Sequence, residues 1–331
     1  MHTNINMDFR TIVNLPPNNG NIALTPHSSV MLIGSCFADH IGQRLQQVLP
    51  QHQVCINPHG TLYNPMSILT VVRSLMKSEP TDAIDADGYF ITNEHAYRHW
   101  DYATSFTAPT KSELEDELIK KWHKAKAVFN NIDLLLITFS TDHGYWLNTT
   151  SQHTRLVANC HKQPSRMFYE RVADEQTMLN EWAEVLAELQ RQHPRVKVVF
   201  TLSPYRYAKY GMHENALSKA RLLLLIDQLE SLYNNVTYFP AYEIISDELR
   251  DYRFYAEDML HPSEQAVSYV WERFSQWSFS PEMHEYAKEH AAIARAMNHR
   301  PLHPEGEEYK RFVERRELKK LAFEKKWNMS F

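Results

Sequence analysis

Short apolar runs alternate with longer amphipathic segments along most of this 331-residue chain, and this alternation limits its fold more than any other feature. Continuous apolar runs bounded by polar residues are typical of buried parallel strands. They span residues 30–33, 54–56, 134–139, 196–202 and 236–239. Strands that alternate with helices pair in parallel, and the helices cover both faces of the sheet. The pattern therefore predicts a three-layer α/β/α fold with a mostly parallel five-stranded sheet.

The segments between the strands have the apolar period of amphipathic helices. These predicted helices span residues 37–49, 66–76, 112–129, 174–192, 216–233 and 262–277. Ser112 with Glu115 forms a capping-box pattern at the start of the third helix. Pro262 suits the first position of the last one.

Two insertions and a tail stand outside this alternation. Residues 79–110 are interpreted as a hairpin, and residues 140–170 as an irregular loop of the polar, aromatic kind that often lines sites. We therefore predict one α/β domain over residues 1–280 and a C-terminal helical extension over residues 281–331. The narrow apolar stripe of the extension is expected to pack on the body or to form a homo-oligomer with a second subunit. It consists of Tyr309, Phe312, Leu318 and Leu321.

Composition and charge argue against several classes of protein. The net charge is −5 and the basic residues are dispersed, so no nucleic-acid partner is expected. No leader pattern and no run of about 18 apolar residues occurs, so no membrane partner is expected. The three cysteines lack CxxC spacing, which favours reduced thiols and a cytoplasmic location. No predicted helical face carries HxxxH or HExxH, so neither a metal nor another cofactor is expected.

Ser35 and Cys36 follow the first predicted strand, at the edge where open parallel sheets bind ligands. A helix that starts beside them directs free backbone N–H groups at a group attached to Ser35. We expect Ser35 to project into the cleft as the nucleophile. Cys36 is expected to pack under the helix as an inert thiol with a raised pKa. The same helix N-terminus would also stabilise a thiolate, so Cys36 stays a rival.

Asp258 and His261 stand three residues apart just before the last predicted helix, a spacing that places their side chains side by side. A carboxylate beside an imidazole holds the tautomer whose Nε2 accepts a proton, and it stabilises the resulting imidazolium. A serine after the first strand, followed by Asp-x-x-His before the last helix, resembles the order in SGNH or GDSL-type hydrolases.

The resemblance is closer to the GSCFA family, because residues 34–38 read GSCFA. It extends over about residues 22–277 and includes four further segments. They are NPHGTLYNP (57–65), VANCHKQP (157–164), TLSPYRY (201–207) and LRDYRFYAEDMLHPS (249–263). This resemblance implies a flavodoxin-like hydrolase fold with Ser35 as nucleophile, His261 as base and Asp258 as its orienting partner.

The wider superfamily implies an oxyanion hole formed by the serine N–H, a glycine N–H after the second strand and an asparagine after the third. Ser35 and Gly60 fit the first two positions. No Gly-x-Asn-Asp follows residues 134–139, so the third donor is open. Asn159 is the candidate for it, with Asn64 and Thr141 as alternatives.

The superfamily also implies a small-molecule or carbohydrate ester as the substrate. Asn64, His161 and Arg206 are candidates for its binding site, Arg206 for an anionic or hydroxyl-rich group. Three functions compete: a serine esterase or deacylase that works through an acyl-enzyme, an O-acyltransferase with the same triad, and a non-catalytic binding module that retains the fold.

Overall fold

The structure is a computed structural model, and it describes all residues except 1–10, 19–21, 149–154, 300–305 and 330. A parallel five-stranded sheet with the order β10-β9-β5-β1-β2 lies at its centre. The strands are β1 (Val30–Gly34), β2 (Val54–Ile56), β5 (Leu134–Phe139), β9 (Lys197–Leu202) and β10 (Val236–Tyr238). All five predicted strands are confirmed, and each strand end differs from the prediction by no more than one residue.

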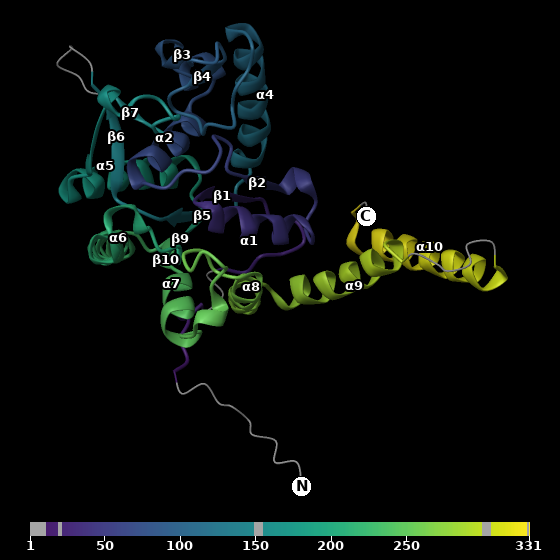
Figure 1. The fold of residues 1–331 in the computed structure, drawn as a ribbon. Coiled ribbons are helices and arrows are strands. Elements are labelled where there is room, and N and C mark those ends of the chain that lie inside the picture. The colour runs from purple at the N-terminus through teal and green to yellow at the C-terminus, as the bar shows by residue number, and fades with distance from the viewer. Residues whose placement is uncertain (1–10, 19–21, 149–154, 300–305, 330) are drawn as a thin grey trace.

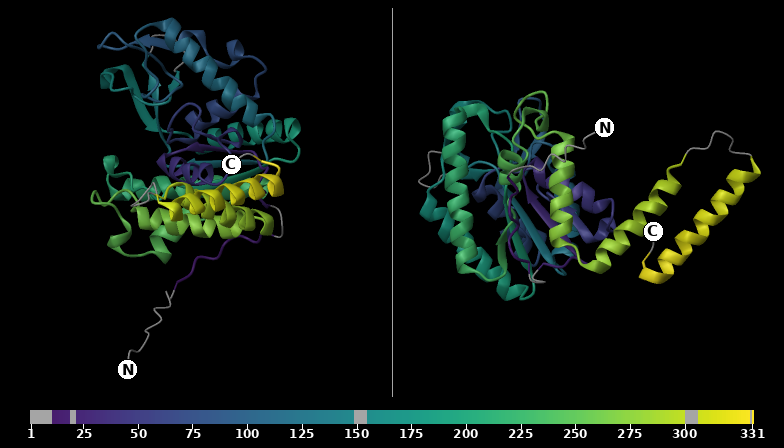
Figure 2. Two further views of the ribbon diagram at one scale, coloured as in Figure 1. Left: turned by 90° about the vertical axis from the view of Figure 1, so that its right-hand side faces the viewer. Right: turned by 90° about the horizontal axis from the view of Figure 1, so that it is seen from below.

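Side chains alternate across the sheet, so each central strand contributes to two apolar cores. In β1, Met31 and Ile33 belong to one core, and Val30 and Leu32 belong to the other. The first core is covered by α2 (Pro65–Met76), α4 (Lys111–Phe129), α5 (Glu175–Gln192) and α6 (Met212–Leu232). The second is covered by α1 (Cys36–Gln46) and α8 (Glu264–Ser278). The predicted three-layer α/β/α architecture is therefore confirmed (Figures 1 and 2).

Two predicted helix starts are wrong because other side chains provide the N-caps. Thr110, rather than Ser112, accepts a hydrogen bond from the Glu113 N–H and caps α4. Ser263 accepts from the Ala266 N–H and caps α8, which leaves Pro262 outside the helix. Helix α6 starts earlier than predicted, after Gly211. Several short helical segments were not predicted, among them α3 (Pro80–Ala83), α7 (Ala241–Glu243) and the π-helical turn Ile244–Glu248 that follows α7.

The two insertions differ in how well they were predicted. The first contains an antiparallel hairpin of β3 (Tyr89–Ile91) and β4 (Tyr97–His99), as expected. The second is not irregular, because it forms an antiparallel sheet with the order β7-β6-β8. Its strands are β6 (His143–Leu147), β7 (Leu156–Val157) and β8 (Phe168–Val172). They pair with one another apart from the central sheet, and most of their residues are exposed or only partly buried. These strands therefore lack the apolar alternation that would have shown them in the sequence.

The C-terminal extension is an antiparallel pair of helices, α9 (Pro281–Met297) and α10 (Glu307–Trp327), that projects from one side of the body (Figures 1 and 2). Phe323 and Trp327 pack against Tyr286 of α9 and form the seam between them. In the predicted stripe, Leu318 and Leu321 are 66% and 60% exposed, so they do not pack on the body of this chain, and their packing on a second subunit stays a prediction. Among the described residues, no helix has the length and apolar character needed to cross a membrane.

Candidate active site

Ser35 lies between β1 and α1, at the carboxyl edge of the sheet, in a turn that requires glycine at position 34. Gly34 has φ +145°, and a Cβ there would lie 2.2 Å from the Thr138 carbonyl oxygen. The Ser35 N–H donates to that same oxygen at 3.3 Å. The Ser35 Oγ accepts from the Phe37 N–H, also at 3.3 Å. Ser35 is therefore the N-cap of α1, and both its backbone donor and its hydroxyl oxygen are engaged in the turn.

The exposures of Ser35 and Cys36 are the reverse of those expected. Ser35 is fully buried because its side chain folds back onto the helix start, whereas Cys36 is partly exposed. Burial and the nearby Asp39 carboxylate raise the pKa of the Cys36 thiol. The N–H groups of Cys36 and Phe37 and the charge of Lys219 lower this pKa, but less strongly. The raised pKa agrees with an inert thiol, although the exposure does not.

Asp258 and His261 form the hydrogen bond that their spacing predicted. The His261 Nδ1 lies 2.5 Å from the Asp258 Oδ2. The Asp258 Oδ1 accepts from the N–H groups of Leu260 and His261, both at 2.9 Å. The His261 N–H and ring, followed by the Leu260 N–H, lower the pKa of Asp258 to about 2. Met259 adopts φ 57°, so the chain turns sharply enough for these bonds to form. The carboxylate is thus held ionised against the imidazole.

The Asp258–His261 pair is exposed and is not bonded to Ser35. Its side chains are 44% and 47% exposed, respectively. Within the described part of the chain, no hydrogen bond joins Ser35 Oγ to His261 Nε2. Tyr205 packs on the His261 ring with a centroid separation of 4.4 Å. The role of Ser35, His261 and Asp258 as a triad stays a prediction.

The loop after β2 is tied to the same edge through Asn57, which adopts φ 42°. Its Oδ1 accepts from the Gly34 N–H at 2.8 Å, and its Nδ2 donates to the Asp39 Oδ1 at 2.7 Å. The Gly60 N–H donates to the Asn57 carbonyl oxygen at 2.7 Å. Gly60 therefore has its only backbone donor engaged in the turn, and this bond has to break before the N–H can serve an oxyanion.

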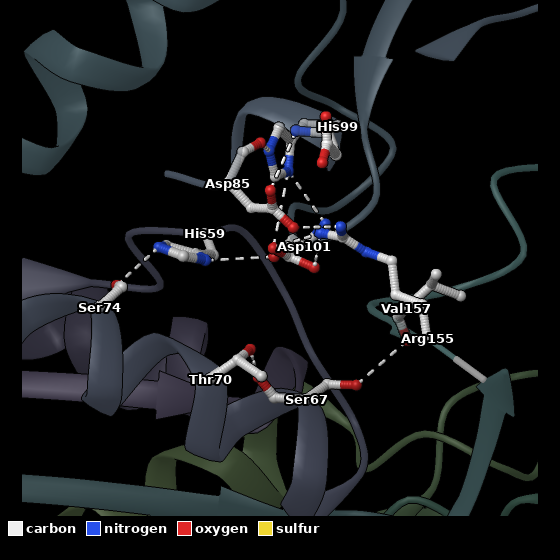
Figure 3. Close-up of polar contacts among 10 residues, drawn as sticks. His59, Ser67, Thr70, Ser74, Asp85, His99, Asp101, Arg155 and Val157 are labelled. Carbon is white, nitrogen blue, oxygen red and sulfur yellow. Dashed lines mark hydrogen bonds and ion pairs between the residues drawn. The ribbon is translucent and has the colours of Figure 1, made fainter. Parts of the chain in front are cut away.

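A polar cluster joins this loop to both insertions (Figure 3). The His59 Nδ1–H donates to the Asp101 carbonyl oxygen at 3.1 Å. Arg155 donates to both carboxylate oxygens of Asp101 at 2.8 Å, and it also pairs with Asp85. The buried His99 ring contacts the Asp85 carbonyl oxygen at 2.9 Å. One arginine of the second insertion thus ties it to the first insertion, which in turn bonds to His59.

Asn159, the candidate for the third oxyanion donor, lies in the second insertion. Its Oδ1 accepts from the Thr104 Oγ1 at 3.0 Å and from the His161 N–H at 2.7 Å. These two bonds orient the amide and engage its oxygen only. The alternatives are structural in this conformation. Asn64 caps α2 by accepting from the Ser67 N–H, and Thr141 accepts from the His143 N–H.

His161 is buried among aromatic side chains. Its ring is 1% exposed and meets Phe90 and Trp100 edge-on. Burial, followed by the Arg98 charge, lowers its pKa to about 4, and a weak interaction with the Trp100 backbone opposes this shift. The role of His161 in substrate binding therefore has no support in this geometry. In the described residues, no three His, Cys, Asp or Glu side chains lie close enough together to hold a metal ion.

The sequence analysis missed Lys219 and Tyr205. Lys219 of α6 is fully buried, and its Nζ donates to the carbonyl oxygens of Ser140 and Ser203 at 2.7 and 2.8 Å. These residues directly follow β5 and β9. Burial lowers the pKa of Lys219 to about 7, and the Asp142 charge opposes this shift. Lys219 gave no sequence signal because one lysine in an amphipathic helix resembles a surface residue. Tyr205 lies in the segment TLSPYRY, which could have singled it out.

The sheet order, read as first, second and later strands, is 2-1-3-4-5, which with helices on both faces defines a flavodoxin-like α/β/α protein. A model of the GSCFA family matches residues 29–274, and a model described as the C-terminal domain of GSCFA domain proteins matches residues 291–330. The chain therefore belongs to the GSCFA family. A comparison with curated proteins found no match.

Two solved structures resemble the chain distantly. One is a family two carbohydrate esterase from Clostridium thermocellum in complex with cellohexaose, at 11% identity and a TM-score of 0.33. The other is the acetyl xylan esterase Est2A from the rumen bacterium Butyrivibrio proteoclasticus, at 9% identity and a TM-score of 0.35. Each comparison covers 76% of this chain and 63% of the other chain.

The close contact between Gly34 and the Thr138 carbonyl oxygen predicts that no other residue fits at position 34, next to Ser35. Gly34→Ala is expected to lower the free energy of unfolding by at least about 4 kcal/mol, because its Cβ meets a backbone oxygen that cannot move aside. Gly211→Ala is the matched control, since Gly211 has φ +88° but a Cβ added there would meet no atom within 4 Å. Its cost is expected to be about 1–2 kcal/mol from backbone strain alone. Urea unfolding measures both, and equal losses would contradict the steric account.

The buried ring of His161 predicts acid sensitivity. Its pKa of about 4 in the fold lies below the 6.5 of a free histidine, so the unfolded state binds the proton more readily. Stability is therefore expected to fall as the pH drops from 6.5 towards 4, by about 3 kcal/mol for this residue. His161→Phe should remove that loss, and replacement of the exposed His213 by Ala should not. Urea titrations at pH 7 and pH 4 measure the free energy of unfolding. If His161→Phe loses as much stability as the wild type over this range, His161 is not the cause of the acid sensitivity.

Proposed function

We propose that this protein is a serine hydrolase that cleaves a carboxylic ester of a small molecule or carbohydrate through an acyl-enzyme. The observation that carries the proposal is the Asp258–His261 hydrogen bond on the loop before α8, with His261 open to solvent. An ionised carboxylate on Nδ1 leaves Nε2 as a proton acceptor. The three free cysteines suit the reducing cytoplasm that we propose as its location.

In this mechanism His261 Nε2 takes the proton from Ser35 Oγ as the oxygen attacks the ester carbonyl. The alkoxide leaving group then takes that proton from His261, which leaves an acyl-Ser35. Water, deprotonated by His261, then attacks the acyl carbon. The bond between the acyl carbon and Ser35 Oγ breaks, the carboxylic acid leaves, and Ser35 Oγ takes the proton back from His261. The Ser35 side chain first has to rotate away from the Phe37 N–H. That rotation frees an N–H at the positive end of α1, where charge on the carbonyl oxygen develops.

Cys36 is a second candidate nucleophile, and its partial exposure favours it. It lies within electrostatic reach of Tyr205, which contacts His261. The raised pKa of its thiol opposes this role, because the thiolate is the reactive form. An O-acyltransferase would use the same groups, with a sugar hydroxyl in place of water.

The nucleophile is tested with 4-nitrophenyl acetate and acetylated sugars. Ser35→Ala is expected to lower kcat by about 10³-fold or more, while Cys36→Ala keeps activity. A fluorophosphonate probe is expected to label Ser35 in the wild type and to fail in His261→Ala, as mapped by peptide mass spectrometry. If iodoacetamide labels Cys36 with loss of activity and Cys36→Ala is inactive, the thiol is the nucleophile. A protein with neither turnover nor labelling is a binding module.

The third oxyanion donor is tested by Asn159→Asp, which retains an oxygen for Thr104 and the His161 N–H but removes the amide donor. The expected result is a decrease in kcat of about 10²-fold with KM nearly unchanged, because the bond strengthens as charge develops on the oxygen. Thr104→Val removes only the supporting contact and is the matched control. An unchanged kcat in Asn159→Asp assigns Asn159 a structural role.

A further inference from the structure

A cavity of about 400 Å³ opens beyond the carboxyl ends of β9 and β10. Its walls come from the loop after β9, the first turn of α6 and the segment that follows α7. Its polar lining includes two arginines, three tyrosines, a buried asparagine and one carboxylate, that of Asp251. The other six are Arg206, Arg250, Tyr242, Tyr252, Tyr255 and Asn215.

This cavity adjoins the loop that carries His261. The Arg206 N–H donates to the Leu260 carbonyl oxygen at 3.0 Å, and Leu260 directly precedes His261. Tyr205, the neighbour of Arg206, packs on the His261 ring. One wall of the cavity therefore also contacts the loop that carries the proposed base.

The lining of the cavity carries two positive charges, those of Arg206 and Arg250, and one negative charge, that of Asp251. Within the described residues, the guanidinium groups of Arg206 and Arg250 take part in no hydrogen bond or ion pair. The carboxylates in and near the cavity accept hydrogen bonds from other groups, and Asp247 accepts from the Ser246 hydroxyl at 3.0 Å. Asp251 accepts from the Arg253 N–H, and Glu243 accepts from the Tyr238 hydroxyl.

The other lining groups suit a sugar ring. Burial raises the pKa of the Tyr255 phenol, the charge of Arg206 opposes this shift and the charge of Asp247 adds to it. The guanidinium and the Asp247 carboxylate therefore both lie within electrostatic reach of the ring. Tyr252 is 77% exposed and offers a free aromatic face. Asn215 is 8% exposed, and its Oδ1 accepts from the Tyr207 N–H at 2.8 Å, which leaves its amide as a donor for a hydroxyl.

We propose that this cavity binds the carboxylate of an acidic sugar through Arg206 and Arg250, so that the substrate is an O-acylated uronic acid residue. The proposal rests on the hydrolase function proposed above. Guanidinium groups bind carboxylates through paired, charge-assisted hydrogen bonds, whereas a neutral sugar offers them no charge. The tyrosines and Asn215 then contact the ring and its hydroxyls.

The test compares kcat/KM for O-acetylated galacturonic acid oligomers with kcat/KM for O-acetylated xylose oligomers of equal length. The wild type is expected to prefer the acidic ester by about tenfold or more at low salt, and the preference should shrink as salt is added. Arg206→Gln and Arg250→Gln should each reduce the ratio about tenfold. Arg295→Gln changes the same charge on the exposed surface of α9, outside the cavity, and should keep the ratio.

Calorimetric binding of unacetylated galacturonic acid oligomers separates this proposal from the hydrolase function. Binding to wild type that weakens about tenfold or more in Arg206→Gln and Arg250→Gln, with no turnover of any ester, supports the cavity and rejects the hydrolase. Turnover of acidic and neutral esters at equal rates, without such binding, overturns the cavity proposal and leaves the hydrolase. Absence of both binding and turnover overturns both.

Discussion

The hydrogen bonds of Asn57 set the geometry on which the candidate site depends. Its backbone N–H donates to the Leu32 carbonyl oxygen, and its side chain joins the Gly34 N–H to Asp39 of α1. One residue thus connects the first strand, the first helix and the loop that carries Gly60. The close approach of Gly34 to Thr138 also brings β5 into contact with this junction. Ser35 takes its position from these contacts, since the turn around it has little freedom.

Two further groups support the same edge from opposite sides. Lys219 joins the ends of β5 and β9 from the helical layer, and Arg155 joins the two insertions above residues 57–60. Both side chains leave water largely or fully and form several hydrogen bonds in exchange. Removal of one bonding partner is therefore costly, because it leaves a buried polar group unpaired. The carboxyl edge is therefore held by polar contacts, while the apolar cores hold the layers together.

The proposed nucleophile and base do not bond to each other in the free protein, and we expect the bond between them to form when substrate binds. Ser35 is buried as a helix cap, and the Asp258–His261 pair stands in solvent on a separate loop. Catalytic hydrogen bonds are often loose before substrate binds, so a direct bond between Ser35 and His261 is not required in the free protein. Tyr205 and the Arg206 backbone contact the loop of His261, and through them the arginine-lined cavity is coupled to the proposed base.

The sequence by itself determined the layers, because the spacing of apolar residues in each segment shows which face of a helix or strand is buried. It thereby specified β1, β2, β5, β9 and β10 and most helices, and the Asp258–His261 pair followed from a spacing of three residues. Only the tertiary structure decided the features that depend on distant partners. Examples are the small sheet of the second insertion, the seam at Phe323 and Trp327, the burial of Lys219 and the reversed exposures of Ser35 and Cys36. These come from hydrogen bonds and packing between segments far apart in the chain, which leave no periodic trace in the local sequence.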